Sequence, residues 1–193
     1  QDPGDGAGGD RSHTMSDPHA LPNHGLGWLD ASGEHAGVVL STRIRLARNL
    51  QGHAFGPRAR VNDREAVLEQ TRRAMDKVEL LAGSTLLALP DLDHRSRGML
   101  LERRLASREL LGDVKVGPSR ATAVLLAAQD PLSVMVNEED HLRLQGLVSG
   151  LRLKEAWNRV DRLDEELGQE LPFAYHHEFG FLTSCPTNAG SGL

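Results

Sequence analysis

Two arginines at a spacing of two, in the segment Ser41-Thr42-Arg43-Ile44-Arg45, could bind a polyanion. Residues two apart on a β-strand point to the same side, so the guanidinium groups of Arg43 and Arg45 would together clamp a triphosphate. The alternative is a solvated strand face whose arginines form surface ion pairs worth ~0–1 kcal/mol each. Taken alone, the segment favours this solvated face.

An acidic segment, Val136-Asn137-Glu138-Glu139-Asp140-His141-Leu142-Arg143, ends an apolar stretch. Three adjacent carboxylates repel one another, so we expect a cation to hold at least one of them. Guanidinium is the natural partner, because it meets a carboxylate with two parallel hydrogen bonds. On a strand, Glu138 would point away from the side of Glu139. The alternatives are an ordinary acidic turn and a metal site; the spacing matches no recognised ligand pattern, so we reject the metal.

The single cysteine, Cys185, lies in the segment Phe179-Gly180-Phe181-Leu182-Thr183-Ser184-Cys185-Pro186-Thr187-Asn188, directly before the glycine-rich run 189–192. A lone cysteine is most often a small buried hydrophobic residue. It forms no internal disulfide, which suits a reducing compartment. Glycine-rich backbone can approach a phosphate closely, but as a free-standing signal this segment is weak.

Hydrophobic periodicity indicates the elements that position these segments. Alternation from Val38 to Leu46 predicts a half-buried strand with Arg43 and Arg45 on its polar side. A capping motif that begins at Asn62 predicts a helix whose apolar stripe continues to Leu81. Further predicted elements are a strand over 84–89, a helix over 95–108, strands over 121–128 and 132–137 joined by a turn at 129–131, a helix with an apolar face over 153–167, and a strand-like stretch over 172–183. Hairpins mixed with amphipathic helices predict an α+β fold with a mainly antiparallel sheet flanked by helices.

Composition excludes several classes of protein. The chain has 193 residues, of which 39% are hydrophobic, and a formal net charge of -5. These values indicate one globular domain rather than a disordered chain, and they make nucleic acid a poor partner. No apolar run is long enough to span a membrane. Residues 1–27 are predicted to be a disordered tail, with vector-derived residues before Met15.

Taken together and in this order, the three segments closely resemble the ATP:guanidino phosphotransferases, also called phosphagen kinases. The stretch Leu171-Pro172-Phe173 adds to the match, and the likeness covers residues 28–193. The resemblance implies the glutamine synthetase-like catalytic domain of these kinases. It implies the N-terminal portion of that domain, in truncated form, because the family pattern continues past Leu193 into a further arginine segment and a second substrate carboxylate.

The resemblance also implies roles for individual residues. The nucleotide-phosphate site would comprise Ser41, Thr42, Arg43, Ile44, Arg45 and Arg143. Glu139 would grip the substrate guanidinium, orient it and accept its proton, with the reactive Cys185 beside it. Where the family usually has a nucleotide-contacting histidine, this chain has Arg104, so the resemblance does not decide whether Arg104 contacts the nucleotide. ATP would bring Mg²⁺, bound through the nucleotide.

Two stretches, Arg104-Leu105-Ala106-Ser107 and Leu153-Lys154-Glu155-Ala156, resemble the branch of the family that phosphorylates arginine side chains in proteins. The short linker before Ser41 agrees, since other branches carry a helical domain there. This branch implies a cytoplasmic kinase that acts on proteins with exposed arginines and works with a Clp protease system and an activator protein, with no nucleic-acid or membrane partner. Two alternatives are a kinase for a free guanidino metabolite and a truncated module that binds nucleotide or arginine without turnover.

Overall fold

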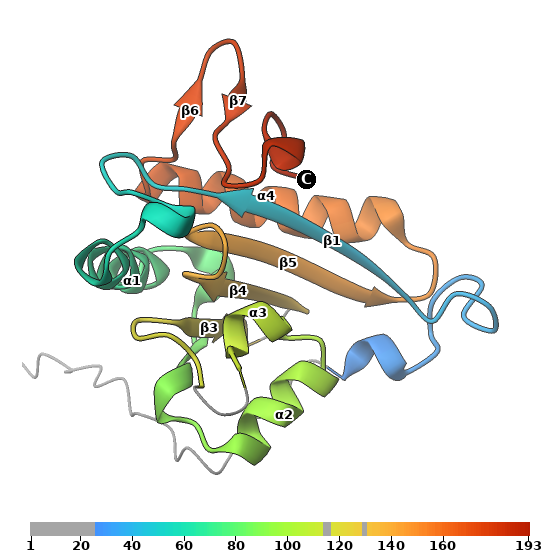
Figure 1. Ribbon diagram of the computed structural model, residues 1–193. Helices are drawn as coiled ribbons and strands as arrows, with labels where there is room; N and C mark the ends of the chain where they lie inside the picture. Colours follow the sequence, from blue (N-terminus) through green and yellow to red (C-terminus); the bar gives the residue numbers. More distant parts are fainter. Residues whose placement is uncertain (1–25, 114–116, 129–130) are drawn as a thin grey trace, which may run out of the picture.

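One antiparallel sheet forms the centre of the molecule (Figure 1). The structure is a computed structural model that describes residues 26–113, 117–128 and 131–193. The strands follow the order β1-β5-β4-β3-β2, and each neighbouring pair is antiparallel. They are β1 (Ser41–Arg48), β2 (Thr85–Ala88), β3 (Ala123–Leu126), β4 (Leu132–Val136) and β5 (Leu142–Ser149). The predicted α+β class with a mainly antiparallel sheet is confirmed.

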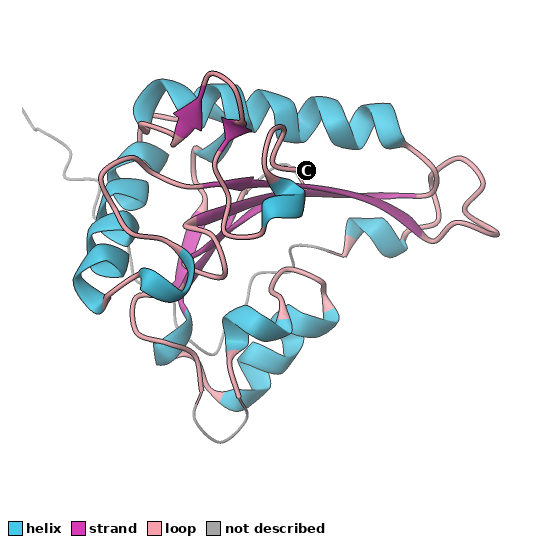
Figure 2. Cartoon of the chain, turned by 45° about the horizontal axis from the view of Figure 1, so that its top comes forward, coloured by secondary structure: helices cyan, strands magenta, loops and turns pink. Residues whose placement is uncertain are grey.

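Helices pack against both faces of this sheet (Figure 2). Helices α1 (Val61–Met75) and α4 (Leu153–Glu170) lie on one face, and α2 (His94–Glu102) and α3 (Arg108–Leu111) lie on the other. In the larger core, Val67 of α1 and Leu163 of α4 pack with Leu144 of β5. In the smaller core, Leu100 of α2 and Leu110 of α3 pack with strand residues that include Met135 of β4.

The smaller core covers only the β2, β3 and β4 part of its face. The register places Arg143 opposite both Met135 and Ala47, and Gln145 opposite Arg45. Residues directly opposite one another share a side of the sheet. The side chains of Arg45, Arg143 and Gln145 therefore lie on the face of α2 and α3, beside the smaller core and outside it.

Shorter elements complete the described chain. A hairpin of β6 (Tyr175–His176) and β7 (Gly180–Phe181) rises above the sheet in Figure 1, and the chain then returns along β1. The backbone N–H of Ala47 donates to the carbonyl of Gly192 at 2.7 Å. The 3₁₀ turns are η1 (Gly27–Leu29), η2 (Gly56–Arg58), η3 (Glu79–Leu81), η4 (Leu89–Asp91) and η5 (Pro186–Asn188).

The first strand and helix both differ from their predicted bounds. Val38, which is 91% exposed, and Leu40, which is 51% exposed, precede β1 instead of packing in it. Helix α1 begins at Val61, so the prediction of Asn62 as its cap is wrong. The carboxylate of Asp63 accepts the backbone N–H of Arg60 at 3.1 Å, and the cap therefore lies two residues earlier than predicted.

Two further predictions were wrong in detail, and one strand was not predicted. The helix predicted over 95–108 ends at Glu102, because Arg104 adopts a positive φ of 59° that an α-helix cannot accommodate. The stretch 172–183 is a short hairpin and not one strand. Strand β5, which pairs with both β1 and β4, was not predicted. Residues 1–25 of the predicted tail, and Gln129 and Asp130 of the predicted turn, lie outside the described residues.

Within the described ranges, none of the helices combines the length and the apolar character that crossing a bilayer requires.

Candidate active site

Four arginines lie together over β1 and β5, on the part of the sheet face that the smaller core does not cover. Arg43 and Arg45 project from β1, Arg143 from β5, and Arg104 follows α2. Burial lowers the pKa of Arg43, and the positive charges of Arg45, Arg104 and Arg143 lower it further. The guanidinium groups are thus close enough to repel one another, and a bound polyanion would relieve that repulsion. We call these four residues the arginine face.

Arg104, whose contact the sequence left open, is held at this face by its surroundings. Its carbonyl accepts a hydrogen bond from Nε2 of Gln145 at 2.7 Å. Its guanidinium carbon lies 5.2 Å from the ring centroid of Trp28, within cation–π range. Sequence reasoning missed Gln145 and Trp28, because neither lies in a recognisable motif.

Two residues predicted to contact ATP point the other way. Thr42 is buried, and its hydroxyl donates to the carbonyl of Gly150 at 2.6 Å and accepts the backbone N–H of Arg152 at 2.9 Å. Ile44 packs against the larger core. Their side chains therefore support the strand and do not join the arginine face, whereas Ser41 shares the side of Arg43.

Arg143 holds two adjacent carboxylates unequally. Its Nη1 lies 2.5 Å from Oε2 of Glu138, and its Nη2 lies 3.5 Å from Oε2 of Glu139. The Glu138 side chain is 1% exposed and accepts a hydrogen bond from the Ser107 hydroxyl, whereas the Glu139 side chain is 49% exposed. The predicted guanidinium partner is confirmed. The expectation that Glu138 points away from Glu139 is wrong, because the chain bends here and is not a strand.

A buried network joins the acidic segment to the cysteine segment. The Asn49 side-chain amide donates to Oδ1 of Asp140 at 2.6 Å, and the backbone N–H of Ser184 donates to the same oxygen at 2.7 Å. The Ser184 hydroxyl donates to the carbonyl of Glu139 at 2.8 Å. The loop of Cys185 is therefore fixed against the backbone of Glu139. Cys185 is partly exposed, and its Sγ lies 2.9 Å from Oγ1 of Thr187.

His141 fixes a second loop against the same network. Its Nδ1 accepts the backbone N–H of Leu50 at 3.0 Å, and its Nε2 lies 3.1 Å from the carbonyl of Ala54. Burial lowers the pKa of His141 and outweighs the hydrogen bond to Ala54, which raises it. The ring is thus neutral with its proton on Nε2. Beyond the polar character of the segment, no sequence pattern points to this role of His141.

On the α4 side of the sheet, Arg48 anchors the cysteine segment. Its Nη2 lies 2.6 Å from Oδ2 of Asp164 on α4, and its Nη1 donates to the carbonyl of Ser191 at 2.8 Å. Its guanidinium carbon also lies 3.6 Å from the ring centroid of Phe181. Burial raises the pKa of Asp164, although the Arg48 hydrogen bond and charge lower it. This buried pair joins β1, α4 and the cysteine segment.

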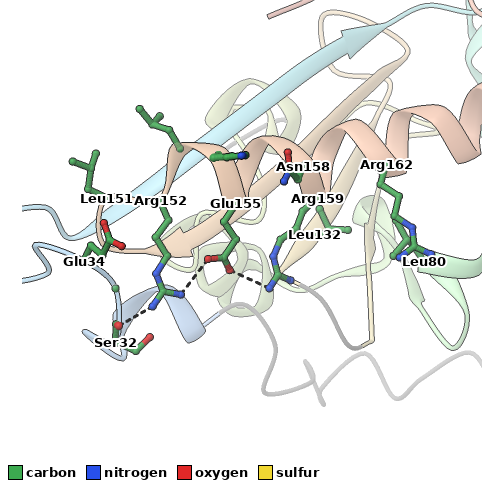
Figure 3. Close-up of a pocket in the computed structure, with 13 residues that line it drawn as sticks. Ser32, Glu34, Leu80, Leu132, Leu151, Arg152, Glu155, Asn158, Arg159 and Arg162 are labelled. Atoms are coloured by element: carbon green, nitrogen blue, oxygen red, sulfur yellow. Dashed lines mark hydrogen bonds and ion pairs between the residues drawn. The ribbon is translucent and has the colours of Figure 1, made fainter.

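A separate cavity of ≈ 930 Å³ follows the first half of α4 (Figure 3). Two of its arginines are paired within it: Arg152 lies 3.4 Å and Arg159 3.1 Å from Glu155, and Arg152 also donates to the carbonyl of Ser32 at 2.7 Å. Because α4 covers the face opposite the arginine face, this cavity is no part of the candidate site.

Residues with metal-ligating side chains are scattered in the described part of the chain, where no three of them could jointly hold an ion. The arginine face itself fits a polyphosphate, because the positive charges of Arg45, Arg104 and Arg143 lie close enough to Arg43 to lower its pKa. Any magnesium used by this site would therefore be held mainly by the nucleotide.

This fold is one that guanidino kinases share. The family model described as "ATP:guanido phosphotransferase, C-terminal catalytic domain" matches residues 66–193, and the chain belongs to this family. Among curated relatives, the protein-arginine kinase of Pelotomaculum thermopropionicum is 40% identical over 169 residues, covering 86% of this chain and 46% of the relative. That of Symbiobacterium thermophilum gives the same identity and coverage. The chain thus spans about half the length of these relatives.

Solved structures share the fold. The substrate-free duplicated taurocyamine kinase of Schistosoma mansoni superposes with a TM-score of 0.71 at 24% identity, covering 92% of this chain and 25% of that one. A lombricine kinase gives a TM-score of 0.68 at 22% identity, covering 85% of this chain and 50% of that one.

Proposed function

We propose that the protein transfers the γ-phosphoryl group of ATP to the guanidinium groups of arginine side chains in proteins. The observation that carries the proposal is the position of Arg143, which contributes to the arginine face and also contacts the half-exposed carboxylate of Glu139. A phosphate donor bound on the arginine face and a cationic acceptor bound at Glu139 would therefore meet. The protein-arginine kinase relatives support the choice of protein substrates.

The donor side requires charge neutralisation. Phosphoryl transfer depends on alignment and on electrostatic stabilisation more than on covalent catalysis. Arg43, Arg45 and Arg143 would bind the triphosphate oxygens with charge-assisted hydrogen bonds. Magnesium bound through the nucleotide would supply further positive charge at the phosphates.

The acceptor side requires a base. A guanidinium with a pKa above about 12 is a poor nucleophile, because its lone pairs are delocalised and it carries a proton on every nitrogen. Glu139 would hold one nitrogen in line with the γ-phosphorus and accept its proton as the P–N bond forms and the bond from the γ-phosphorus to the departing ADP oxygen breaks. Glu138 cannot replace it, because Arg143 and Ser107 already hold that buried carboxylate. Cys185 is fixed beside Glu139 through the Ser184 bonds and would contact the same guanidinium. A thiolate at this position would stabilise the positive charge of the substrate guanidinium.

The proposal extends to the setting that the family resemblance implies: the cytoplasm, a Clp protease system and an activator protein. The test is phosphorylation of an arginine-rich protein by the complete protein with Mg-ATP, with acid-labile phosphoarginine measured over time. We expect phosphoarginine on the protein, and only weak inhibition by free arginine. Phosphorylation of free arginine alone would instead support a kinase for a guanidino metabolite. Nucleotide binding without any phosphoarginine would support a module that binds and does not turn over.

A further inference from the structure

A groove of ≈ 440 Å³ opens beside the acceptor position. It is lined by Ala54, Phe55, Pro57, Arg58, Thr183 and Ser184, from the loop after β1 and from the cysteine segment. Its two walls are in close contact, because a Cβ at Gly56 would lie 2.8 Å from the Ser184 Oγ, and the φ of +62° at Gly56 also favours glycine. The same Ser184 hydroxyl donates to the carbonyl of Glu139, so the groove adjoins the proposed base.

The walls of this groove are held in place. Nε2 of His141 lies 3.1 Å from the carbonyl of Ala54, and the Phe55 ring meets the His141 ring edge-on at 5.9 Å between centroids. These contacts tie the loop to the network that fixes Glu139 and Cys185. The groove is therefore a preformed part of the site, and a ligand would pay little ordering entropy to occupy it.

The groove combines apolar walls with one available cation. Phe55 and Pro57 supply apolar surface, and Arg58 is exposed. Among the described residues, nothing forms a hydrogen bond or an ion pair with the Arg58 guanidinium. A ligand suited to this lining carries a carboxylate next to aliphatic surface, as an acidic residue in a polypeptide does.

We propose that this groove binds the segment of a protein substrate that flanks the target arginine, and that Arg58 selects an acidic side chain in that segment. The inference rests on the proposed function, because the target guanidinium must lie at Glu139 for the flanking residues to reach the groove. It adds that substrates are chosen by their sequence as well as by an exposed arginine.

The test uses fluorescent peptides with a single arginine and the complete protein. One glutamate is moved one position at a time along both sides of the arginine, with the glutamine peptides as the neutral set. Binding is measured by fluorescence anisotropy, and phosphorylation by the rate of phosphoarginine formation. We expect glutamate at one or two positions to improve affinity and kcat/KM about 1.5- to fivefold, the range for one exposed ion pair.

Two charge reversals identify the residue responsible. Arg58→Glu should remove or invert the acidic preference through KM and affinity, and leave kcat and the affinity for ATP unchanged. Arg72→Glu, the same change at an exposed position of α1 that does not line the groove, should keep the preference. Equal binding of acidic and neutral peptides by the unchanged protein would overturn the inference, as would an equal loss for every peptide in Arg58→Glu. A selective loss of free-arginine binding would assign Arg58 to an α-carboxylate instead.

The two readouts separate this inference from the proposed function. Phosphorylation without an acidic preference overturns the inference alone. An acidic preference in binding without any phosphoarginine overturns the proposed kinase activity and leaves the groove as a peptide site. Absence of both peptide binding and phosphorylation overturns both.

Discussion

Two arginines on neighbouring strands, Arg48 and Arg143, each hold carboxylates, and they lie on opposite faces of the sheet. Arg48 points toward α4, where its side chain is 3% exposed and its guanidinium binds Asp164, a carbonyl and an aromatic ring. Arg143 points toward the arginine face, where it holds the buried Glu138 tightly and Glu139 more loosely. The first cluster is closed to solvent, whereas the second leaves one carboxylate half exposed.

The two clusters contain the same pairing of arginine with carboxylate, but one stabilises the fold and the other belongs to the candidate site. A buried ion pair contributes rigidity, and breaking it leaves an uncompensated charge in a medium of low dielectric constant. A partly exposed carboxylate beside a cation can exchange that cation for a substrate guanidinium at little cost. Substitutions in the two clusters should therefore affect different properties of the protein.

The largest expected effect is that of Glu139→Gln on turnover. The substitution keeps the shape and removes the base, so phosphoarginine formation should fall by about 10²–10⁴-fold, the range for general base catalysis. The free energy of unfolding should change by less than about 0.5 kcal/mol, because the side chain is 49% exposed. Glu178→Gln, at a side chain that is 64% exposed, is the control for the charge change. Near-normal turnover in Glu139→Gln would refute its role as the base.

Asp164→Ala should act on stability. It leaves the Arg48 guanidinium buried without its carboxylate, so the free energy of unfolding should fall by about 3–5 kcal/mol in urea titrations. Replacing both residues, as in Arg48→Met with Asp164→Leu, should recover much of this loss, because the uncompensated charge is then gone. A double variant as unstable as Asp164→Ala would show that the charge is not the cause.

Arg43→Ala should act on nucleotide binding. Losing one charge-assisted hydrogen bond should weaken ATP binding by about 1.5–3 kcal/mol, measured by calorimetry on the complete protein. Thr42→Val is the control on the opposite face of the sheet, because the Thr42 hydroxyl bonds to Gly150 and Arg152 there and not to the arginine face. It should lower stability by about 1 kcal/mol and leave ATP affinity unchanged. If both variants lost equal ATP affinity, the assignment of the faces would be wrong.

The smallest expected effect concerns pH. Burial holds the pKa of His141 below its ordinary value of 6.5. Below that pH the unfolded chain binds a proton that the folded chain does not, so stability falls as the pH drops from 6.5 toward the folded pKa. The slope contributed by this one group is at most about 1.4 kcal/mol per pH unit. His141→Gln should be less stable at neutral pH, with a shallower slope in urea titrations between pH 7 and 5. An unchanged slope would assign the proton uptake to another group.

The sequence predicted what depends on local pattern. Strand alternation placed Arg43 and Arg45 together, and the acidic run predicted a guanidinium partner, which is Arg143. Arg48 lies beyond the predicted alternation, and its partner Asp164 is 116 residues away, so no local pattern points to this pair. The bond from Asn49 to Asp140 spans 91 residues, and it likewise depends on the tertiary fold.

Strand β5 escaped prediction for a physical reason. Apolar and polar residues alternate only over its first half, Leu142-Arg143-Leu144-Gln145, and from Gly146 on the pattern is lost, because this central strand is buried on both sides. Arg104 was misplaced in a helix because residue preferences do not reveal a positive φ at an arginine. The sequence therefore predicts those parts of the site that depend on a single strand or a single run of residues. It does not predict the contacts between distant segments.

The hydrogen bond from Ala47 to Gly192 has a consequence for biosynthesis. Strand β1 lies at the edge of the sheet, and the segment ending near Gly192 covers that edge, with Arg48 bonded to Ser191 across 143 residues. While the ribosome has yet to release these later residues, the edge of β1 is bare and open to pairing with other chains. Closing contacts between residues so far apart is also slow. The nascent polypeptide therefore stays open to pairing at this edge until the segment emerges.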